Sequence, residues 1–170
     1  MSESTDQHRA AAQGRSARCA VLTVSDTRTE ATDKGGQIII EQLKAAGHTI
    51  ADYRIVKDEA AAIGDQLQRW LSELSLDAIL TTGGTGIARR DTTVEVVRRF
   101  LDKELEGFGE LFRMLSWQEV GPAAMLSRAV AGLAGETLIF AMPGSTNAVR
   151  LAMSKLIIPE LPHLVWERSR

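Results

Sequence analysis

The sequence feature that most constrains the fold is a glycine-rich stretch, Thr81 to Thr93, that lies between two apolar segments. The preceding segment, Ala78 to Leu80, is typical of a buried strand, and the following one, Val94 to Val97, is typical of a helix start. Three glycines within positions 83 to 86 allow a sharp turn and a close approach of backbone N–H groups to a ligand. Because the helix start adds unpaired N–H groups and a positive dipole end, the unit is typical of a phosphate site.

Charged residues directly after the glycines strengthen this interpretation. Arg89 and Arg90 can pair with phosphate oxygens in a forked geometry, and Asp91 can hold a magnesium ion. The alternative is a purely structural turn in which Asp91 or Thr92 caps the helix, and the Thr92-x-x-Glu95 spacing fits a capping box. The Arg-Arg-Asp sequence favours an anionic ligand.

Length and composition narrow the classes of protein. The chain has 170 residues, 44% of them hydrophobic and 25% charged, as in ordinary globular domains. The net charge of -2 argues against a nucleic-acid-binding protein, which usually carries a basic face. With the single cysteine Cys19 in an apolar run, neither an intrachain disulfide nor a cysteine zinc cluster is possible, and we expect a buried, inert thiol.

The two ends of the chain differ in character. Residues 1–17 are polar and small, which predicts a disordered N-terminal tail without a secretory signal, and residues 18–170 are expected to form a single domain. No stretch approaches the roughly 20 apolar residues that cross a membrane. We therefore expect a cytoplasmic protein with no membrane partner.

Apolar periodicity predicts strands that alternate with helices along most of the chain. Strands are expected at 18–25, 48–56, 77–82, 129–134 and 137–142, the last two as a hairpin, and helices at 33–47, 59–74, 94–100, 105–115 and from Ser145 until Pro159 and Pro162 end it. This order predicts an α/β fold with a mainly parallel sheet that is covered on both faces.

Polar residues follow several of the predicted strands. Ser25-Asp26, Asp58 and the glycine loop come directly after strand ends, and ligands in such folds bind outside the carboxyl ends of strands, so one shared rim is expected. Asp58 and Asp91 could hold a divalent metal between them and the phosphates of a nucleotide. Each could equally cap a helix, and spacing alone leaves both possibilities open.

Several motifs together resemble one known family. The sequence is similar to the molybdenum-cofactor biosynthesis family, which comprises the molybdenum-cofactor protein B branch and the molybdopterin adenylyltransferase (Mog, gephyrin G-domain) branch. The resemblance covers about residues 18 to 158 and is closest to the B branch in Gly107 to Arg113 and Pro143 to Thr146. The motifs that carry it are Val24-Ser25-Asp26, Asp33-Lys34-Gly35, Val56-Lys57-Asp58-Glu59, Thr81 to Asp91, Gly107-Phe108-Gly109-Glu110, Leu126-Ser127-Arg128 and Met142-Pro143-Gly144-Ser145.

This resemblance implies a three-layer α/β/α fold of the molybdopterin-binding kind, assembled as a homotrimer or a homohexamer. It implies binding of molybdopterin and of ATP, and magnesium-dependent transfer of AMP to the terminal phosphate of molybdopterin with release of pyrophosphate. It also implies contact with the molybdenum-insertion protein of the pathway. The catalytic and metal-binding pair of the adenylyltransferases maps onto Asp58 and Asp91. After Asp91, the adenylyltransferase pattern has a proline where this chain reads Thr92-Thr93-Val94.

The resemblance and the rim argument together give a set of substrate-binding candidates. The loop backbone and the serine hydroxyls are expected to hold phosphate and pterin. The candidates are Ser25, Asp26, Gly83, Gly84, Thr85, Gly86, Arg90, Ser127, Arg128, Pro143, Gly144 and Ser145.

Two alternatives compete with an adenylyltransferase. The first is a non-catalytic molybdopterin carrier or scaffold that uses the same pocket. The second is a generic nucleotide-binding domain such as a dehydrogenase. It is disfavoured because the first strand is followed by Ser25 to Arg28 and not by a Gly-x-Gly-x-x-Gly motif. Apolar residues of the 105–117 region, Phe108, Leu111, Phe112 and Trp117, exceed what one short helix needs for packing and predict a subunit interface.

Overall fold

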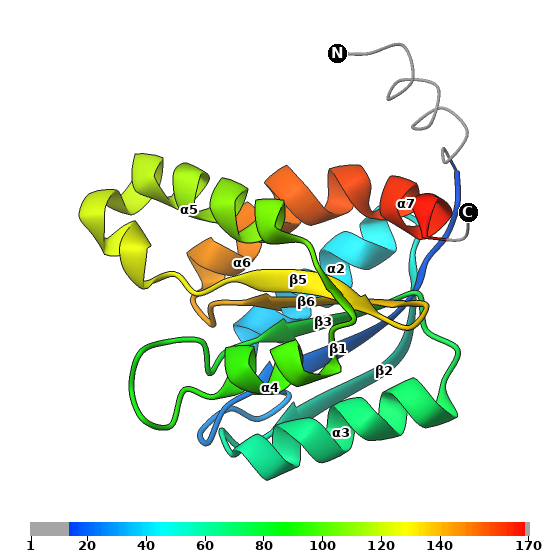
Figure 1. Cartoon of the computed structure of the whole chain (residues 1–170), viewed down its shortest axis with the longest axis horizontal. Helices are drawn as coiled ribbons and strands as arrows, with labels where there is room; N and C mark the ends of the chain where they lie inside the picture. Colours follow the sequence, from blue (N-terminus) through cyan, green and yellow to red (C-terminus); the bar gives the residue numbers. More distant parts are fainter. Residues whose placement is uncertain (1–13, 169–170) are drawn as a thin grey trace.

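The computed structural model describes residues 14–168 and contains a mixed six-stranded sheet (Figure 1). The strands are β1 (Arg18–Val24), β2 (Thr49–Val56), β3 (Ala78–Thr82), β4 (Lys103–Glu104), β5 (Val130–Ala134) and β6 (Thr137–Met142). Their order is β2-β1-β3-β6-β5-β4. The first four strands in this order pair in parallel, and β5 pairs antiparallel with both β6 and β4. The predicted α/β class with a mainly parallel sheet is confirmed.

Helices cover both faces of the sheet, as the three-layer prediction requires. They are α2 (Lys34–Ala45), α3 (Ala60–Glu73), α4 (Thr93–Phe100), α5 (Glu106–Val120), the 3-10 helix η1 (Gly121–Leu126), α6 (Thr146–Ala152), the π-helical turn η2 (Met153–Ile157) and α7 (Ile158–Glu167). In Figure 1, α3 and α4 lie below the sheet and α5 and α7 lie above it, and α2 and α6 pack in the same core as α5 and α7.

The central strands are apolar along their whole length because both of their faces are buried. Alternate residues of β1 enter two separate cores: Val21 packs with the α2, α5, α6 and α7 layer, and Leu22 packs with the α3 and α4 layer. Val21 pairs with Leu80 of β3 in register. Each fully buried aliphatic side chain of this kind contributes about 1.5–3 kcal/mol. Cys19 is also fully buried, which raises the pKa of its thiol to about 12 and agrees with an inert role.

Helix α2 shows how local sequence signals fix an element. Its N-cap is Asp33, whose carboxylate accepts from the backbone N of Gly36 at 3.0 Å. The same carboxylate accepts from Thr23 Oγ1 and from the Tyr53 hydroxyl, both at 2.5 Å, so the start of α2 is joined to β1 and β2. The helix stops before Gly47, which has a φ of +84°. Both ends agree with the prediction.

The expected end of the last helix at the prolines is wrong. The chain continues from α6 through the π-helical turn η2 into α7, which carries Pro159 in its first turn and Pro162 inside it. Pro159 directly follows the change from π-helical to α-helical geometry, and its fixed φ is compatible with a helical conformation. Burial of Leu161 and Val165 on the same helix offsets the hydrogen bond that is lost at Pro162.

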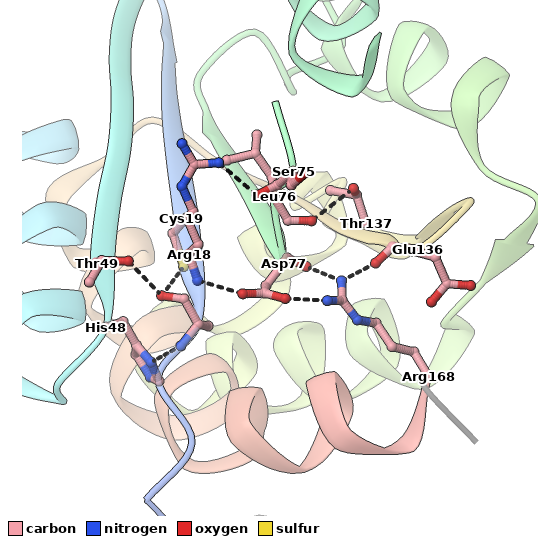
Figure 2. Close-up of polar contacts among 11 residues, drawn as sticks. Arg18, Cys19, His48, Thr49, Ser75, Leu76, Asp77, Glu136, Thr137 and Arg168 are labelled. Atoms are coloured by element: carbon pink, nitrogen blue, oxygen red, sulfur yellow. Dashed lines mark hydrogen bonds and ion pairs between the residues drawn. The ribbon is translucent and has the colours of Figure 1, made fainter. Parts of the chain in front are cut away.

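At the end of the sheet where β1 and β3 begin, polar contacts join the sheet to the C-terminal helix α7 (Figure 2). Arg168 donates to the backbone O of Asp77 at 2.8 Å and pairs with the Asp77 carboxylate. Nearby, the backbone N of Ala17 donates to Nδ1 of the buried His48 at 3.1 Å. Residues 1–13 of the expected tail lie outside the described residues, whereas Ala17 is buried. Between residues 14 and 168, no helix is long and apolar enough to cross a membrane.

Candidate functional site

The loops that follow β1, β2, β3 and β6 meet at one rim of the sheet. The backbone N of Ser25, after β1, donates to the backbone O of Val56 in β2 at 2.8 Å. The backbone N of Gly83, after β3, donates to the backbone O of Met142 in β6 at 3.1 Å. Because these strands are parallel, their carboxyl ends coincide, and the long loop between β3 and α4 projects beyond them (Figure 1). The predicted common rim is therefore present.

Glycine is required at the centre of this rim. Gly83 has a φ of +98°, and a Cβ at this position would lie 2.2 Å from the backbone O of Val24. A Cβ at Gly144 would lie 3.1 Å from the Cα of Gly83. The loops after β3 and β6 can therefore approach β1 and each other only without side chains at these positions.

Two adjoining cavities open at the rim. The first, of about 260 Å³, is lined by the predicted residues Ser25, Gly83 and Gly144, together with Thr27, Arg28 and Asp33, among others. The second, of about 440 Å³, shares Ser25 and Arg28 with the first. It is also lined by Asp26, by Arg54 of β2 and by Lys57, which directly follows β2. Sequence reasoning missed Arg28 as a rim cation, although it stands three residues after Ser25.

The two predicted catalytic carboxylates lie against the glycine loop. A Cβ at Gly84 would lie 2.8 Å from Asp58 Oδ1, and a Cβ at Gly86 would lie 2.6 Å from Asp91 Oδ2. Burial, and then repulsion from the carboxylates of Asp91 and Asp26, raise the pKa of Asp58 above its ordinary value. The structure thus brings Asp58 and Asp91 into one electrostatic environment beside glycines that are two positions apart.

The helix-capping alternative for these two residues is wrong. The N-cap of α3 is Glu59 and that of α4 is Thr92, and neither side chain makes a capping hydrogen bond. The Asp91 carboxylate instead accepts from the backbone N of Ala88 at 2.8 Å, within the loop. Neither Asp58 nor Asp91 is therefore the N-cap of a helix, and each carboxylate instead contacts the loop backbone, Asp58 at Thr92 and Asp91 at Ala88.

The capping box at Thr92 is not formed, and Arg128 has partners in the protein that the sequence did not reveal. Arg128 Nε donates to the backbone O of Thr85 at 3.0 Å, and its Nη2 donates to the backbone O of Asp91 at 3.0 Å. Its Nη1 and Nη2 also donate to the Glu95 carboxylate, and the N-cap Thr92 makes no side-chain capping hydrogen bond. This pairing lowers the pKa of Glu95. With these partners Arg128 joins the loop at Thr85 and Asp91 to Glu95 of α4, and its role toward a substrate stays a prediction.

Arg90 and Asp26 pair with each other across the rim. Asp26 Oδ1 also accepts from the backbone N of Asp58 at 3.4 Å, and the positive charge of Arg90 lowers the pKa of Asp58, against the effect of burial. Both predicted ligand residues therefore lie next to the acidic pair. The Arg90 side chain is 66% exposed, so an incoming phosphate can reach it.

The remaining candidates take different positions. Ser145 caps α6 as predicted, accepting from the backbone N of Ala148 at 3.2 Å, and its own hydroxyl hydrogen is available for donation. The backbone O of Pro143 accepts from Thr82 Oγ1 at 3.2 Å. Thr85 is buried, and Ser127 is the C-cap of η1. Neither rim cavity is lined by Ser127, nor by Asp58, Asp91, Arg90 or Ser145.

A magnesium ion suits the donors that this rim presents. Within residues 14–168, no group of three or more His, Cys, Asp or Glu side chains could hold a metal, so Asp58 and Asp91 would act as a pair. Magnesium is commonly bound through one or two carboxylates, with waters and substrate phosphates as its other ligands. In addition, Asp58 Oδ1, Thr92 Oγ1 and Thr93 Oγ1 are buried without a hydrogen-bond partner in this part of the chain. Such hard oxygen atoms fit the ion.

Comparison with known proteins identifies relatives that cover most of the chain. Residues 20–163 match the family model MoCF_biosynth, described as "Probable molybdopterin binding domain". Molybdenum cofactor biosynthesis protein B of Staphylococcus carnosus (strain TM300) is 60% identical over 159 residues, which are 92% of this chain and 93% of that protein.

Two solved structures are also similar to this chain in fold and in sequence. A crystal structure of a molybdenum cofactor biosynthesis protein B has a TM-score of 0.89 and 52% identity, over 92% of this chain and 98% of that one. The tungsten cofactor synthesizing protein MoaB from Pyrococcus furiosus has a TM-score of 0.83 and 37% identity, over 92% of this chain and 99% of that one.

Proposed function

Because this chain belongs to the family of molybdopterin-binding domains of molybdenum-cofactor biosynthesis, we propose that its rim binds molybdopterin and transfers AMP to it from ATP. The reaction joins the terminal phosphate of molybdopterin to the α-phosphorus of ATP. The bond from that phosphorus to the bridging oxygen breaks, and pyrophosphate leaves. The proposal comprises a nucleotidyltransferase activity that depends on magnesium.

One observation carries the proposal. Asp58 and Asp91 lie beside Gly84 and Gly86, neither caps a helix, and Asp58 Oδ1 is buried without a partner among the described residues. A buried oxygen without a partner costs about 1–3 kcal/mol, more for a charged group, so a bound species that satisfies it is expected. A carboxylate pair that a purely structural role does not explain supports a metal-dependent reaction on phosphates.

The chemistry needs charge neutralisation and alignment more than proton transfer. Magnesium, when bound by Asp58 and Asp91, would supply positive charge on the ATP phosphates. The protein supplies Arg90 and Arg28 as cations at the rim, and the N–H groups of the glycine loop as donors. Asp26 keeps Arg90 beside the acidic pair before substrates arrive.

The two adjoining cavities suit a reaction with two substrates. They share Ser25 and Arg28, so ligands in both would have their phosphates near the same hydroxyl and guanidinium. The Ser145 hydroxyl stands at the start of α6, where the helix dipole also favours an anion. This arrangement supports the transfer of a phosphoryl-linked group between neighbouring ligands.

A second candidate function is a non-catalytic molybdopterin carrier. The high identity to proteins named for the B branch, rather than for adenylyl transfer, favours it. The presence of both Asp58 and Asp91 favours the enzyme.

The experiment that separates the two is incubation of the pure protein with molybdopterin, ATP and magnesium. The enzyme predicts adenylylated molybdopterin and an equal amount of pyrophosphate, both lost in the Asp58→Asn variant. Binding of molybdopterin without either product would support the carrier. Failure to bind molybdopterin would contradict both.

A further inference from the structure

Beside Gly84, two buried oxygen atoms without a hydrogen-bond partner among residues 14–168 come together, Thr93 Oγ1 and Asp58 Oδ1, and we call this place the niche. A Cβ at Gly84 would meet Thr93 Oγ1 at 2.3 Å, Asp58 Oδ1 at 2.8 Å and Val24 Cγ1 at 3.0 Å, which are the three closest atoms outside residues 83–85. Gly84 itself has a φ of +63°. The hydroxyl of Thr93 and the carboxylate of Asp58 therefore both approach the side of Gly84 where any other residue would carry its Cβ.

The Thr93 hydroxyl is completely buried and has no hydrogen-bond partner among residues 14–168. Thr93 opens α4, and its backbone N is already used, donating to the backbone O of Gly84 at 3.0 Å. The side chain is thus not needed to hold the loop to the helix. Burying an unsatisfied hydroxyl costs free energy, so a structural role alone does not explain a threonine here.

The charge around the niche indicates which ligand would satisfy it. Three carboxylates, those of Asp58, Asp91 and Asp26, lie close together, and burial of Asp58 followed by repulsion from the other two raises the pKa of Asp58. A neutral hydroxyl oxygen beside a carboxylate is a donor set that magnesium accepts, as with the Ser or Thr hydroxyl of phosphate-binding loops.

We propose that the Thr93 hydroxyl is a further ligand of the divalent cation, which it binds together with Asp58 Oδ1 in the niche beside Gly84. The inference rests on the proposed function, because it needs the cation that adenylyl transfer requires. It goes further by assigning a binding role to a residue that lies outside the Asp58 and Asp91 pair.

Manganese binding by the whole protein tests this directly. The protein is freed of metal with a chelator, and binding of Mn²⁺ alone is measured from the electron paramagnetic resonance signal of the free ion. Thr93→Val keeps the shape of the side chain and removes the oxygen, so its affinity should fall about tenfold. Thr93→Ser keeps the oxygen and should bind within about twofold of the wild type.

Thr81→Val is the matched control. Thr81, on β3, has a hydroxyl that is equally buried and unpartnered among the described residues, but it is not one of the three atoms closest to the niche. Its substitution should leave Mn²⁺ affinity unchanged. Without metal, both valine variants should melt at or above the wild-type temperature, since each replaces an unsatisfied hydroxyl by a methyl group. With saturating Mn²⁺, the melting temperature of Thr93→Val should rise less than that of the wild type, and the melting temperature of Thr81→Val should rise as much as that of the wild type.

Three outcomes would overturn the inference. If the wild type binds Mn²⁺ and Thr93→Val binds it equally well, Thr93 is not a ligand, and Asp58→Asn then decides whether the proposed function survives. If Thr93→Val melts lower without metal while Thr81→Val does not, the hydroxyl is structural. If the wild type binds no Mn²⁺, the niche is no cation site and the metal role in the proposed function fails with it.

Discussion

Gly83 is the residue at which the loops of the rim come closest together. Its backbone N reaches β6, its Cα lies against Gly144, and the side where a Cβ would stand is filled by the backbone O of Val24. Backbone atoms of a buried parallel strand cannot move away cheaply, because they belong to the sheet's hydrogen-bond ladder. The glycine is therefore a requirement of three-dimensional packing as well as of its φ angle.

Gly83→Ala should lower the free energy of unfolding by about 3 kcal/mol, combining positive-φ strain with a clash against backbone. Urea unfolding measures this. Gly47→Ala is the matched control, because Gly47 also has a positive φ, +84°, but nothing lies within 4 Å of its Cβ position. It should cost about 1 kcal/mol. Equal losses for the two variants would show that the contact with Val24 does not matter.

His48 makes stability depend on pH at the other end of the sheet. Burial lowers the pKa of His48 from its ordinary 6.5, partly offset by the Asp77 carboxylate, and Nδ1 must stay unprotonated to accept from the backbone N of Ala17. The unfolded chain therefore binds more protons below pH 6.5, so stability that is fully present above this pH is lost as the pH falls further. His48→Asn keeps an acceptor for Ala17 and cannot titrate. Between pH 8 and about 5.5, the wild type should lose more stability in urea unfolding than this variant; equal losses would contradict the assignment.

At the scale of elements, the loop from Gly83 to Thr92 is held by contacts from one arginine in another part of the sequence, and we call this set of contacts the brace. Arg128, just before β5, bonds to the backbone at Thr85 and Asp91 and to Glu95 in α4. The brace therefore sets the distance between the loop that carries Asp91 and the helix that follows it. Its effect on a ligand would be indirect, through the position of Asp91.

Lysine cannot bond to three partners in one plane. Arg128→Lys should therefore raise the activation free energy of AMP transfer by more than it lowers the free energy of unfolding. Glu95→Gln should have a smaller effect in the same direction, and the double variant should lose less than the sum of the two, with a coupling of about 1 kcal/mol. Single-turnover transfer and urea unfolding on the same samples provide the comparison. Additive effects would mean that the two side chains act independently.

The elements show which parts of the structure local sequence determines. The ends of α2 were predictable because Asp33 and Gly47 act on residues within one turn. The capping box at Thr92 was not, because Glu95 has a stronger partner, Arg128, that lies 33 residues away in the sequence. The continuation past Pro159 likewise depends on the π-helical turn and on burial of α7, which no local pattern reveals.

The candidate site also has one part that the sequence predicts and another part that it does not. The rim was predictable because parallel strands place all their carboxyl ends together, and this brought Ser25, Asp58 and the loop to one place. Contacts that form only in the folded chain could not be predicted, such as the pairing that uses the donors of Arg128 and the niche that Thr93 shares with Asp58. A threonine two residues after an acidic loop residue, at the first position of a helix, is the signal that points to the niche.

At the scale of the whole molecule, the outer face of α5 is exposed and apolar. Leu111, Met114, Trp117 and Val120 recur every third residue and are 46%, 54%, 59% and 55% exposed. Of the residues predicted for an interface, Phe112 is instead part of the core, with Phe108 packed against it and against Phe140. An apolar face of this kind usually marks a contact between proteins.

We therefore expect a trimer or hexamer in solution, and light scattering at micromolar concentration measures it. Trp117→Glu should dissociate the assembly without lowering the melting temperature of the subunit, because Trp117 is mostly exposed. Gln118→Glu adds the same charge one residue further along α5 and should leave the assembly intact. A wild-type protein that is monomeric would refute the expectation.

The central claim is that the carboxylates beside the glycine loop serve catalysis, and Asp91→Asn tests it most directly. The asparagine keeps an oxygen that can accept from the backbone N of Ala88, so the loop and the melting temperature should be preserved. Loss of the negative charge should lower single-turnover AMP transfer on the order of a hundredfold or more, with molybdopterin affinity little changed. A variant that transfers AMP at the wild-type rate would contradict the account.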